Sequence, residues 1–427
     1  MRRLPRYGIE RAAALLAKLN TMKKRTSTST FVFQRLLGTL LLLSIIGCTE
    51  PYALQTRNFE SALVIEASIS NELKQHSIKI SRTYRLGESG PTFENGANVY
   101  VQDDLGNTFD FEQQDTLYVS ENAFAPNPER AYTLHIVTSD GTSYSSTPEK
   151  QTTPTPIESL TAVASNLGEL PAIQIRINTS DPTGNSRYYR YEYEEAGRFK
   201  VPHWRNKYLA VYPDNDDDDT FPELLLMDRT EEAETCYKKG RSKSIILVST
   251  VGLAEDRIID YPIRTIADTA YLINERYGIK VRQYVQNLAS YTFYKTMSEL
   301  SSTGNLLSQL QPGFFYGNIR SDGNPNEKVI GFFEVSAVDE KVVMFNYGNF
   351  FPGQLPPAFP SECKFDTYIQ DVLEPGQFLG LQLIERVQEN AVNYYETDTQ
   401  GNYVVVTSKC GDCRLSGSNI TPPWWQN

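Results

Sequence analysis

Short segments in which apolar and polar residues alternate recur along the chain after residue 60, and turn residues separate them. In HSIKISRTYRL, Ile78 and Ile80 stand between polar neighbours, as residues do in a strand with one buried face. GANVYVQDDLGNTFDFEQ holds two such segments around a turn at 104–107, and AYTLHIVTSDGTSYSS repeats the arrangement around 139–141. With 26 Tyr and 20 Phe, which favour strands, the chain is expected to be mainly β.

The same pattern divides the chain into two predicted domains. The strand spacing predicts an N-terminal β-sandwich over residues 58–153. Pro148, Pro154 and Pro156 lie around the end of this range, and we expect a stiff linker there because proline cannot continue a sheet interior. Beyond it we expect a larger β-rich domain over 154–427, with a helical insertion and a cysteine-containing tail. Its segments PAIQIRINTS and SRYYRYEYEEAG, joined by a turn at 181–184, look like the B and C strands of a fibronectin type III-like sandwich.

Two further segments of the second domain predict local structure. SYTFYKTMSELSS places Tyr291, Tyr294, Met297 and Leu300 at helical spacing, which indicates the helical insertion. KVIGFFEVSAVDEKVVMFN reads as two strands joined by a tight turn near Asp339.

The start of the chain has the features of an export signal. An uncharged run over 36–46 follows basic residues, and it is shorter than the roughly 20 residues that a membrane span requires. Ile45, Ile46, Gly47 and Cys48 resemble the lipobox of bacterial lipoproteins. That resemblance implies cleavage before Cys48, lipidation of its thiol, a signal peptide over 1–47 and a lipid tether over 48–57. Because Met22 opens a second basic start, residues 1–21 read as an extension of the gene model.

Two other interpretations of this run stay open: an ordinary signal peptide with a chance cysteine, and a short buried helix.

The net charge of the chain limits which partners it can bind. The formal net charge is −11, and the segment before Cys48 is basic, so the remainder is more acidic than the whole. An acidic chain repels phosphate backbones and anionic lipid, so we expect no nucleic-acid partner and a membrane hold through acyl chains alone.

Apart from Cys48, the chain has four cysteines: Cys236, Cys363, Cys410 and Cys413. An even number in an exported protein predicts disulfides, and four cysteines allow three pairings between which the sequence does not choose. We expect one cysteine of Cys410-Gly411-Asp412-Cys413 to bond to Cys363 and so attach the tail to the core. Zinc binding or redox activity by this pair are the alternatives.

Several blocks of the sequence resemble one family. They are SALVIEASIS, HSIKISRTYRLG and GANVYVQDDLGNTF, then TCYKKGRSKSIILVSTVGLAEDRIIDYPI with RYGIKVRQYVQNLASYTFYK, and last GNIRSDGNPNEKVIGFFEVSAV with CGDCRLSGSNITPPWW. In their order they resemble domain-of-unknown-function family 4249, lipoproteins of Bacteroidota-type bacteria. The resemblance implies an outer-membrane lipoprotein of the cell envelope, often encoded beside a TonB-dependent transporter. It implies no catalytic residues and no cofactor.

Two groups of residues are candidate ligand sites. Asp214, Asp216 and Asp218 belong to an acidic run whose oxygens suit calcium, although the run lacks the glycine and glutamate of an EF-hand; a solvated loop is the alternative. Trp204, Trp424 and Trp425 could stack on a flat ligand, or could pack in the interior. The tyrosines at 188, 189, 191 and 193 lie on a predicted strand, and those outside the core would line a surface suited to binding.

Signatures of catalysis are few. The three histidines, His76, His135 and His203, have no spacing typical of a metal pair, and no nucleophile elbow, zinc-protease or Walker motif occurs. Together with the lipobox, the sandwich-like strands and what the family resemblance implies, this favours a binding or accessory lipoprotein that docks on, or loads, a TonB-dependent outer-membrane transporter. A surface glycan-active or proteolytic enzyme is one alternative, since paired carboxylates leave no short motif. A structural or adhesive envelope protein is the other.

Overall fold

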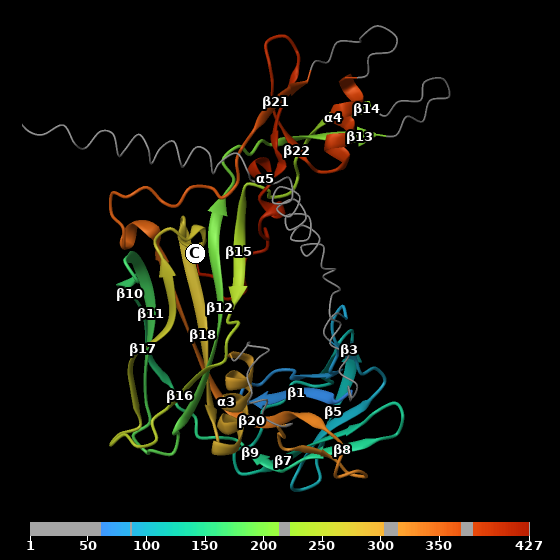
Figure 1. Cartoon of the computed structure of the whole chain (residues 1–427), viewed down its shortest axis with the longest axis vertical. Helices are drawn as coiled ribbons and strands as arrows, with labels where there is room; N and C mark the ends of the chain where they lie inside the picture. Colours follow the sequence, from blue (N-terminus) through green and yellow to red (C-terminus); the bar gives the residue numbers. More distant parts are fainter. Residues whose placement is uncertain (1–60, 86–87, 213–222, 303–314, 369–378, 427) are drawn as a thin grey trace, which may run out of the picture. The chain divides into compact units, whose positions relative to one another are not determined.

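The computed structural model describes residues 61–85, 88–212, 223–302, 315–368 and 379–426, and Ser61–Asn427 forms one compact unit. This part of the chain is mainly β, which confirms the prediction from the alternating pattern (Figure 1). The residues predicted as signal peptide, lipobox and tether lie outside the described residues, and so do Asp214, Asp216 and Asp218.

Most strands belong to one 15-stranded sheet, ordered β15-β12-β18-β20-β1-β2-β6-β5-β4-β7-β8-β19, with β16, β3 and β9 paired to β12, β2 and β7. Its strands are β1 Leu63–Ser70, β2 Ser77–Arg82, β3 Thr92–Phe93, β4 Asn98–Asp103, β5 Thr108–Gln114, β6 Leu117–Ser120, β7 Ala131–Val137, β8 Ser143–Ser146, β9 Glu149–Lys150, β12 Tyr188–Lys200, β15 Thr235–Arg241, β16 Ile246–Ser249, β18 Arg276–Gln286, β19 Ile319–Ser321 and β20 Val329–Asn346. Ile78 and Ile80 are fully buried, as alternation requires.

The prediction of two strands and a turn near Asp339 is wrong, because β20 is one continuous strand. Its first half pairs in parallel with β1, and its second half pairs antiparallel with β18. The polar residues that favoured a turn have partners on β10 of a second sheet and on the neighbouring strand β18. The Asp339 carboxylate accepts the Ile157 N–H at 2.7 Å, and Glu340 pairs with Arg282 at 3.1 Å.

Three more strands form a second layer: β10 Ile157–Leu167, β11 Leu170–Ser180 and β17 Arg257–Ala267, in the order β10-β11-β17. They share one apolar core with β12, β18 and β20, in which Ile173, Ile175, Tyr189, Tyr191 and Val281 are fully buried. Two sheets therefore pack around a common core. The finer description of this region as fibronectin type III-like stays a prediction.

A second core lies under β1 to β8, and it crosses the boundary expected from the sequence. It contains Val329 and Phe333 of β20 together with Leu63, Val99 and Leu134. A strand from late in the chain thus completes the N-terminal part. The boundary at residue 153 stays a prediction.

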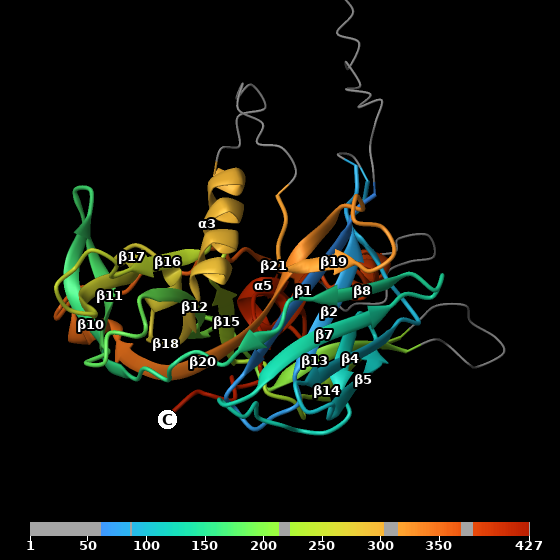
Figure 2. The ribbon, with the colours of Figure 1, turned by 90° about the horizontal axis from the view of Figure 1, so that it is seen from below.

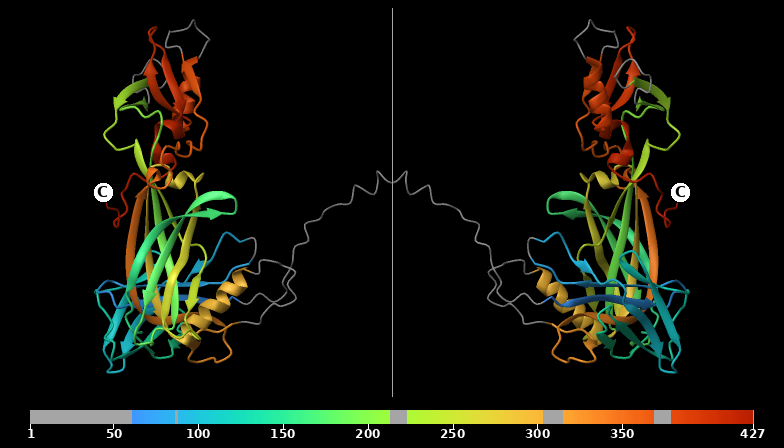
Figure 3. Two further views of the ribbon diagram at one scale, coloured as in Figure 1. Left: turned by 90° about the vertical axis from the view of Figure 1, so that its left-hand side faces the viewer. Right: turned by 90° about the vertical axis from the view of Figure 1, so that its right-hand side faces the viewer.

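The helical insertion is confirmed: α3 spans Leu288–Ser302 and begins directly after β18. Phe293 on this helix is buried and contacts the ring of Phe332 on β20 at 5.6 Å between centroids. Figures 2 and 3 show α3 on the outside of the long strands, next to β12 and β16. The helix therefore covers one face of β12 and β20.

Elements from two separate parts of the chain, within 207–228 and within 365–407, form a smaller cluster. They are β13 Lys207–Tyr212 paired with β14 Glu223–Asp228, the sheet β21 Phe365–Tyr368, β23 Tyr403–Thr407 and β22 Val392–Thr397, and α4 Leu379–Gln388. Leu209, Leu383 and Val405 are their shared core. The remaining short helices are η1 Tyr271–Ile273, η2 Tyr347–Asn349, α5 Ser408–Gly411 and η3 Cys413–Leu415.

Candidate functional site

Two disulfide bonds hold the tail. Cys236 on β15 bonds to Cys413, and Cys363 bonds to Cys410 on α5. The two cysteines of the CGDC motif thus bond to two different distant segments, and neither carries a free thiol. Cys236, Cys410 and Cys413 are fully buried. This arrangement crosslinks the tail, and it leaves no sulfur available to zinc or to a redox cycle while the bonds are intact.

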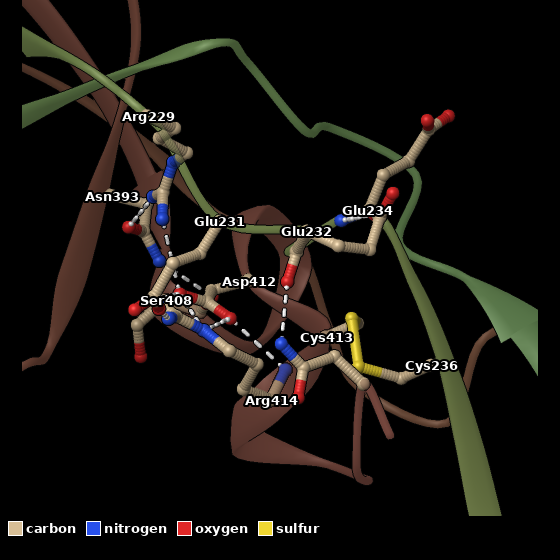
Figure 4. A network of polar contacts seen from close by, with 11 residues as sticks. Arg229, Glu231, Glu232, Glu234, Cys236, Asn393, Ser408, Asp412, Cys413 and Arg414 are labelled. Atoms are coloured by element: carbon tan, nitrogen blue, oxygen red, sulfur yellow. Dashed lines mark hydrogen bonds and ion pairs between the residues drawn. A yellow bond between two sulfur atoms is a disulfide. The ribbon is translucent and has the colours of Figure 1, made fainter. Parts of the chain in front are cut away.

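Between these disulfides, Asp412 is the centre of an ionic network (Figure 4). Its carboxylate accepts hydrogen bonds from Arg229 Nη1 at 3.1 Å and Arg414 Nη2 at 2.7 Å, and Arg414 also pairs with Glu231. Arg229 Nη2 donates to Asn393 Oδ1 at 2.6 Å. Burial alone would raise the pKa of Asp412, but hydrogen bonds from Arg414 and the charges of both arginines lower it. The network therefore fixes α5 and η3 against the segment before β15.

Trp204 lies beside the same junction. It is half-buried and packs against the cluster of Phe199, Val201, Cys236 and Cys413. Its neighbour His203 donates its backbone N–H to the Cys410 carbonyl at 3.0 Å. The indole ring thus has an intramolecular packing partner.

Trp424 and Trp425 also pack on the chain itself. Trp425 is 8% exposed and meets Tyr237 edge-on at 5.0 Å between ring centroids, while Trp424 Nε1 donates to Glu194 Oε2 at 2.9 Å. A Cβ on Gly278 would lie 3.1 Å from both indoles, so this glycine lets the tail lie flat on β18. Stacking of a ligand on these tryptophans stays a prediction.

A buried ion pair in the sheet was not foreseen from the sequence. Arg190 lies between the rings of Tyr284 and Tyr294, 4.0 and 4.5 Å from their centroids. Glu334 accepts from Arg190 Nη2 at 2.5 Å, from Ser290 Oγ at 2.7 Å and from Gln286 Nε2 at 3.1 Å. The available signal was the lone acid inside the apolar run GFFEVSAV. Because its acceptors are used within the protein, the pair has a structural role that joins α3 to β12 and β20.

A solvent-open cavity of about 590 Å³ lies between β12, β16, β17 and α3, and we call it the α3 pocket. Its lining includes Tyr193, Tyr261 and Tyr291 with Arg264 and Lys295. Burial raises the pKa of Tyr193 and of Tyr291, so both phenols keep their protons at neutral pH. The sequence named Tyr193 only as one of four clustered tyrosines, and the two cations lie on β17 and α3, which only the fold brings together.

The described ranges contain no group of three or more His, Cys, Asp and Glu side chains that could hold a metal ion. None of the helices described by the structure combines the length and the apolar content that spanning a bilayer requires.

Comparison with known proteins identifies one family. The family model described as Domain of unknown function (DUF4249) matches residues 49–342. A comparison with curated proteins gives no match. The matched range contains every element that lines the α3 pocket, whereas Cys363, Cys410, Cys413 and the closing CGDCRLSGSNITPPWW lie beyond it. Because the match covers more than half of the sequence, the chain belongs to the DUF4249 family.

Proposed function

We propose that this protein is a lipoprotein of the outer membrane, anchored by acyl chains on Cys48, that binds a ligand as the accessory of a TonB-dependent transporter. The observation that carries the proposal is the run Ile45-Ile46-Gly47-Cys48 after an uncharged segment too short to span a bilayer. Each buried CH₂ of an acyl chain contributes about 0.8 kcal/mol, so several chains hold a folded domain without a spanning helix.

The disulfide bonds support a location outside the cytosol. Two disulfides in one chain are typical of exported proteins, because the cytosol keeps thiols reduced. The compact unit begins at Ser61, which is 13 residues after Cys48 in the sequence. The family resemblance supports the transporter as partner, since members are often encoded beside one.

The α3 pocket supports a binding role rather than chemistry. Its size falls within the 300–1,000 Å³ that is usual for ligand sites, and it combines aromatic rings with a few charged groups. Glycoside hydrolysis would need two carboxylates facing each other, and Glu299 is the one carboxylate that the described lining contains.

Labelling tests the anchor. Cells expressing the full chain are grown with radiolabelled palmitate, beside a Cys48→Ser variant and a Thr49→Ala control. We expect label and membrane association for the native chain and the control, and loss of both for Cys48→Ser. Unchanged labelling of Cys48→Ser would refute the anchor.

Co-purification tests the partner. The native lipoprotein is isolated from detergent-solubilised outer membranes, and the bound proteins are identified by mass spectrometry. A TonB-dependent transporter in the native sample, and none in a mock purification, is the expected result. Recovery of the lipoprotein without any such transporter would contradict the accessory role.

A further inference from the structure

The α3 pocket lies where the two layers leave their edges open. β12 pairs with β16 through Tyr188–Tyr191 and with β15 from Glu194 onward, so its outer partner changes beside Tyr193. β17 is the edge strand of the second layer. α3 adds one further wall. The pocket is therefore built from four regular elements.

Four hydrogen-bond donors of the lining have no hydrogen-bond partner among the described residues. In the part of the chain that the structure describes, the phenol groups of Tyr193, Tyr261 and Tyr291 make no hydrogen bond, and neither does the Lys295 ammonium. An ammonium group only donates, and a phenol donates readily. Such a lining matches a ligand rich in acceptors.

The lining also contains two cationic side chains. Arg264 lines the pocket, while its counter-ion Glu195 lies behind the lining, 7% exposed, at 3.2 and 3.3 Å from Arg264 Nε and Nη2. Lys295 is the second cation, and Glu299 is the one anion among the described lining residues. Because Glu195 neutralises Arg264, the described lining carries one further cation, Lys295, and one anion, Glu299, in an otherwise acidic protein.

The pocket also has an apolar part whose rings are held in position. Tyr261 stacks on Tyr191 at 6.3 Å between centroids, and Tyr291 contacts Tyr188 at 4.9 Å. Ile246 and Ile263 line the same space. Since neighbouring rings restrict these tyrosines, binding requires little ordering of side chains.

We infer that the α3 pocket binds a small organic acid. The carboxylate of the ligand accepts hydrogen bonds from Lys295 and from the tyrosine phenols, and its ring-sized apolar part packs against Tyr261 and Tyr291. The inference rests on the ligand-binding half of the proposed function and names the ligand class. Two sources share this chemistry, an aromatic acid and an acidic sugar. Both supply a carboxylate that accepts several hydrogen bonds and a ring with an apolar face.

Matched probes test the inference on the full chain in detergent by isothermal titration calorimetry. The first pair is 2-naphthoate and its neutral amide; the second is digalacturonate and the neutral galactose disaccharide. We expect one acid to bind roughly tenfold or more tightly than its neutral partner, since hydrogen bonds to charged groups contribute most. The acid that binds identifies the source. Absence of binding by both acids, or equal binding of acid and neutral partner, would overturn the inference.

Variants locate the site. Lys295→Gln removes the ammonium and Tyr261→Phe removes one phenol, and each is expected to weaken the acid roughly five- to tenfold without affecting the neutral partner. Lys150→Gln changes an exposed lysine of β9 outside the pocket and is expected to have no effect. Unchanged acid binding in Lys295→Gln would place the ligand elsewhere. Acid binding by a protein that co-purifies with no transporter would refute the accessory role alone.

Discussion

The buried pair Arg190–Glu334 allows a quantitative test of how α3, β12 and β20 are joined. The side chains of Arg190 and Glu334 are 6% and 2% exposed, so neither charge is solvated by water when its partner is removed. Glu334→Gln keeps the shape of the side chain and removes its charge. Breaking a buried pair costs about 3–5 kcal/mol, and we expect the lower end, near 3 kcal/mol, because Arg190 keeps the half-exposed Glu192 as a partner.

Urea unfolding of the full chain with intact disulfides, followed by circular dichroism, measures this loss. Glu66→Gln is the matched control, because Glu66 pairs with Lys79 at the surface and its loss is expected to cost no more than about 1 kcal/mol. The double variant Arg190→Met, Glu334→Gln lacks both charges, so no unpaired charge stays buried. We therefore expect its loss of unfolding free energy to be at least about 1.5 kcal/mol smaller than the sum of the losses of the two single variants.

Two results would refute this reasoning. The first is a loss for Glu334→Gln no larger than that for Glu66→Gln, which would mean that water reaches the buried site. The second is strict additivity in the double variant, which would mean that Arg190 and Glu334 act independently.

Three further predictions concern stability. Cys413→Ser breaks the bond to β15 and should lower the unfolding free energy by about 2–5 kcal/mol, measured by urea titration; an unchanged midpoint would show that the tail is held without it. Burial alone would raise the pKa of Glu72, but hydrogen bonds, first that of Lys74, lower it from 4.5 to about 2. The ionised form therefore stabilises the fold above pH 4.5, and this contribution is lost as the pH falls toward 2; Glu72→Gln should flatten the pH dependence of unfolding in that window. A Cβ on Gly317 would lie 1.5 Å from a backbone oxygen, so Gly317→Ala should cost more than about 2 kcal/mol in urea unfolding, whereas Gly323→Ala, with open space, should change stability by less than about 0.5 kcal/mol.

Local patterns were sufficient where one element decides the outcome. Ile78 and Ile80 alternate with polar residues and are buried on β2, and the helical spacing around Tyr291 and Tyr294 corresponds to α3. Both follow from the geometry of a single strand or helix, so a short stretch of sequence contains the whole signal.

Local patterns failed where a partner from elsewhere decides the structure. The polar residues near Asp339 indicated a turn, yet they belong to the continuous strand β20 and pair with Ile157 of β10 and Arg282 of β18. Long-range partners of this kind are not visible in the segment itself.

The sequence by itself determined that this chain is mainly β, that one helix interrupts it and that its four downstream cysteines are available for disulfides, because these properties depend on residue type and on periods of a few residues. Only the tertiary structure decided which cysteines pair, that β20 joins two cores, and that Arg264 and Lys295 meet three tyrosines at one pocket. The physical reason is that these features depend on contacts between residues far apart in the chain, and such contacts are set by the packing of whole sheets rather than by any local preference.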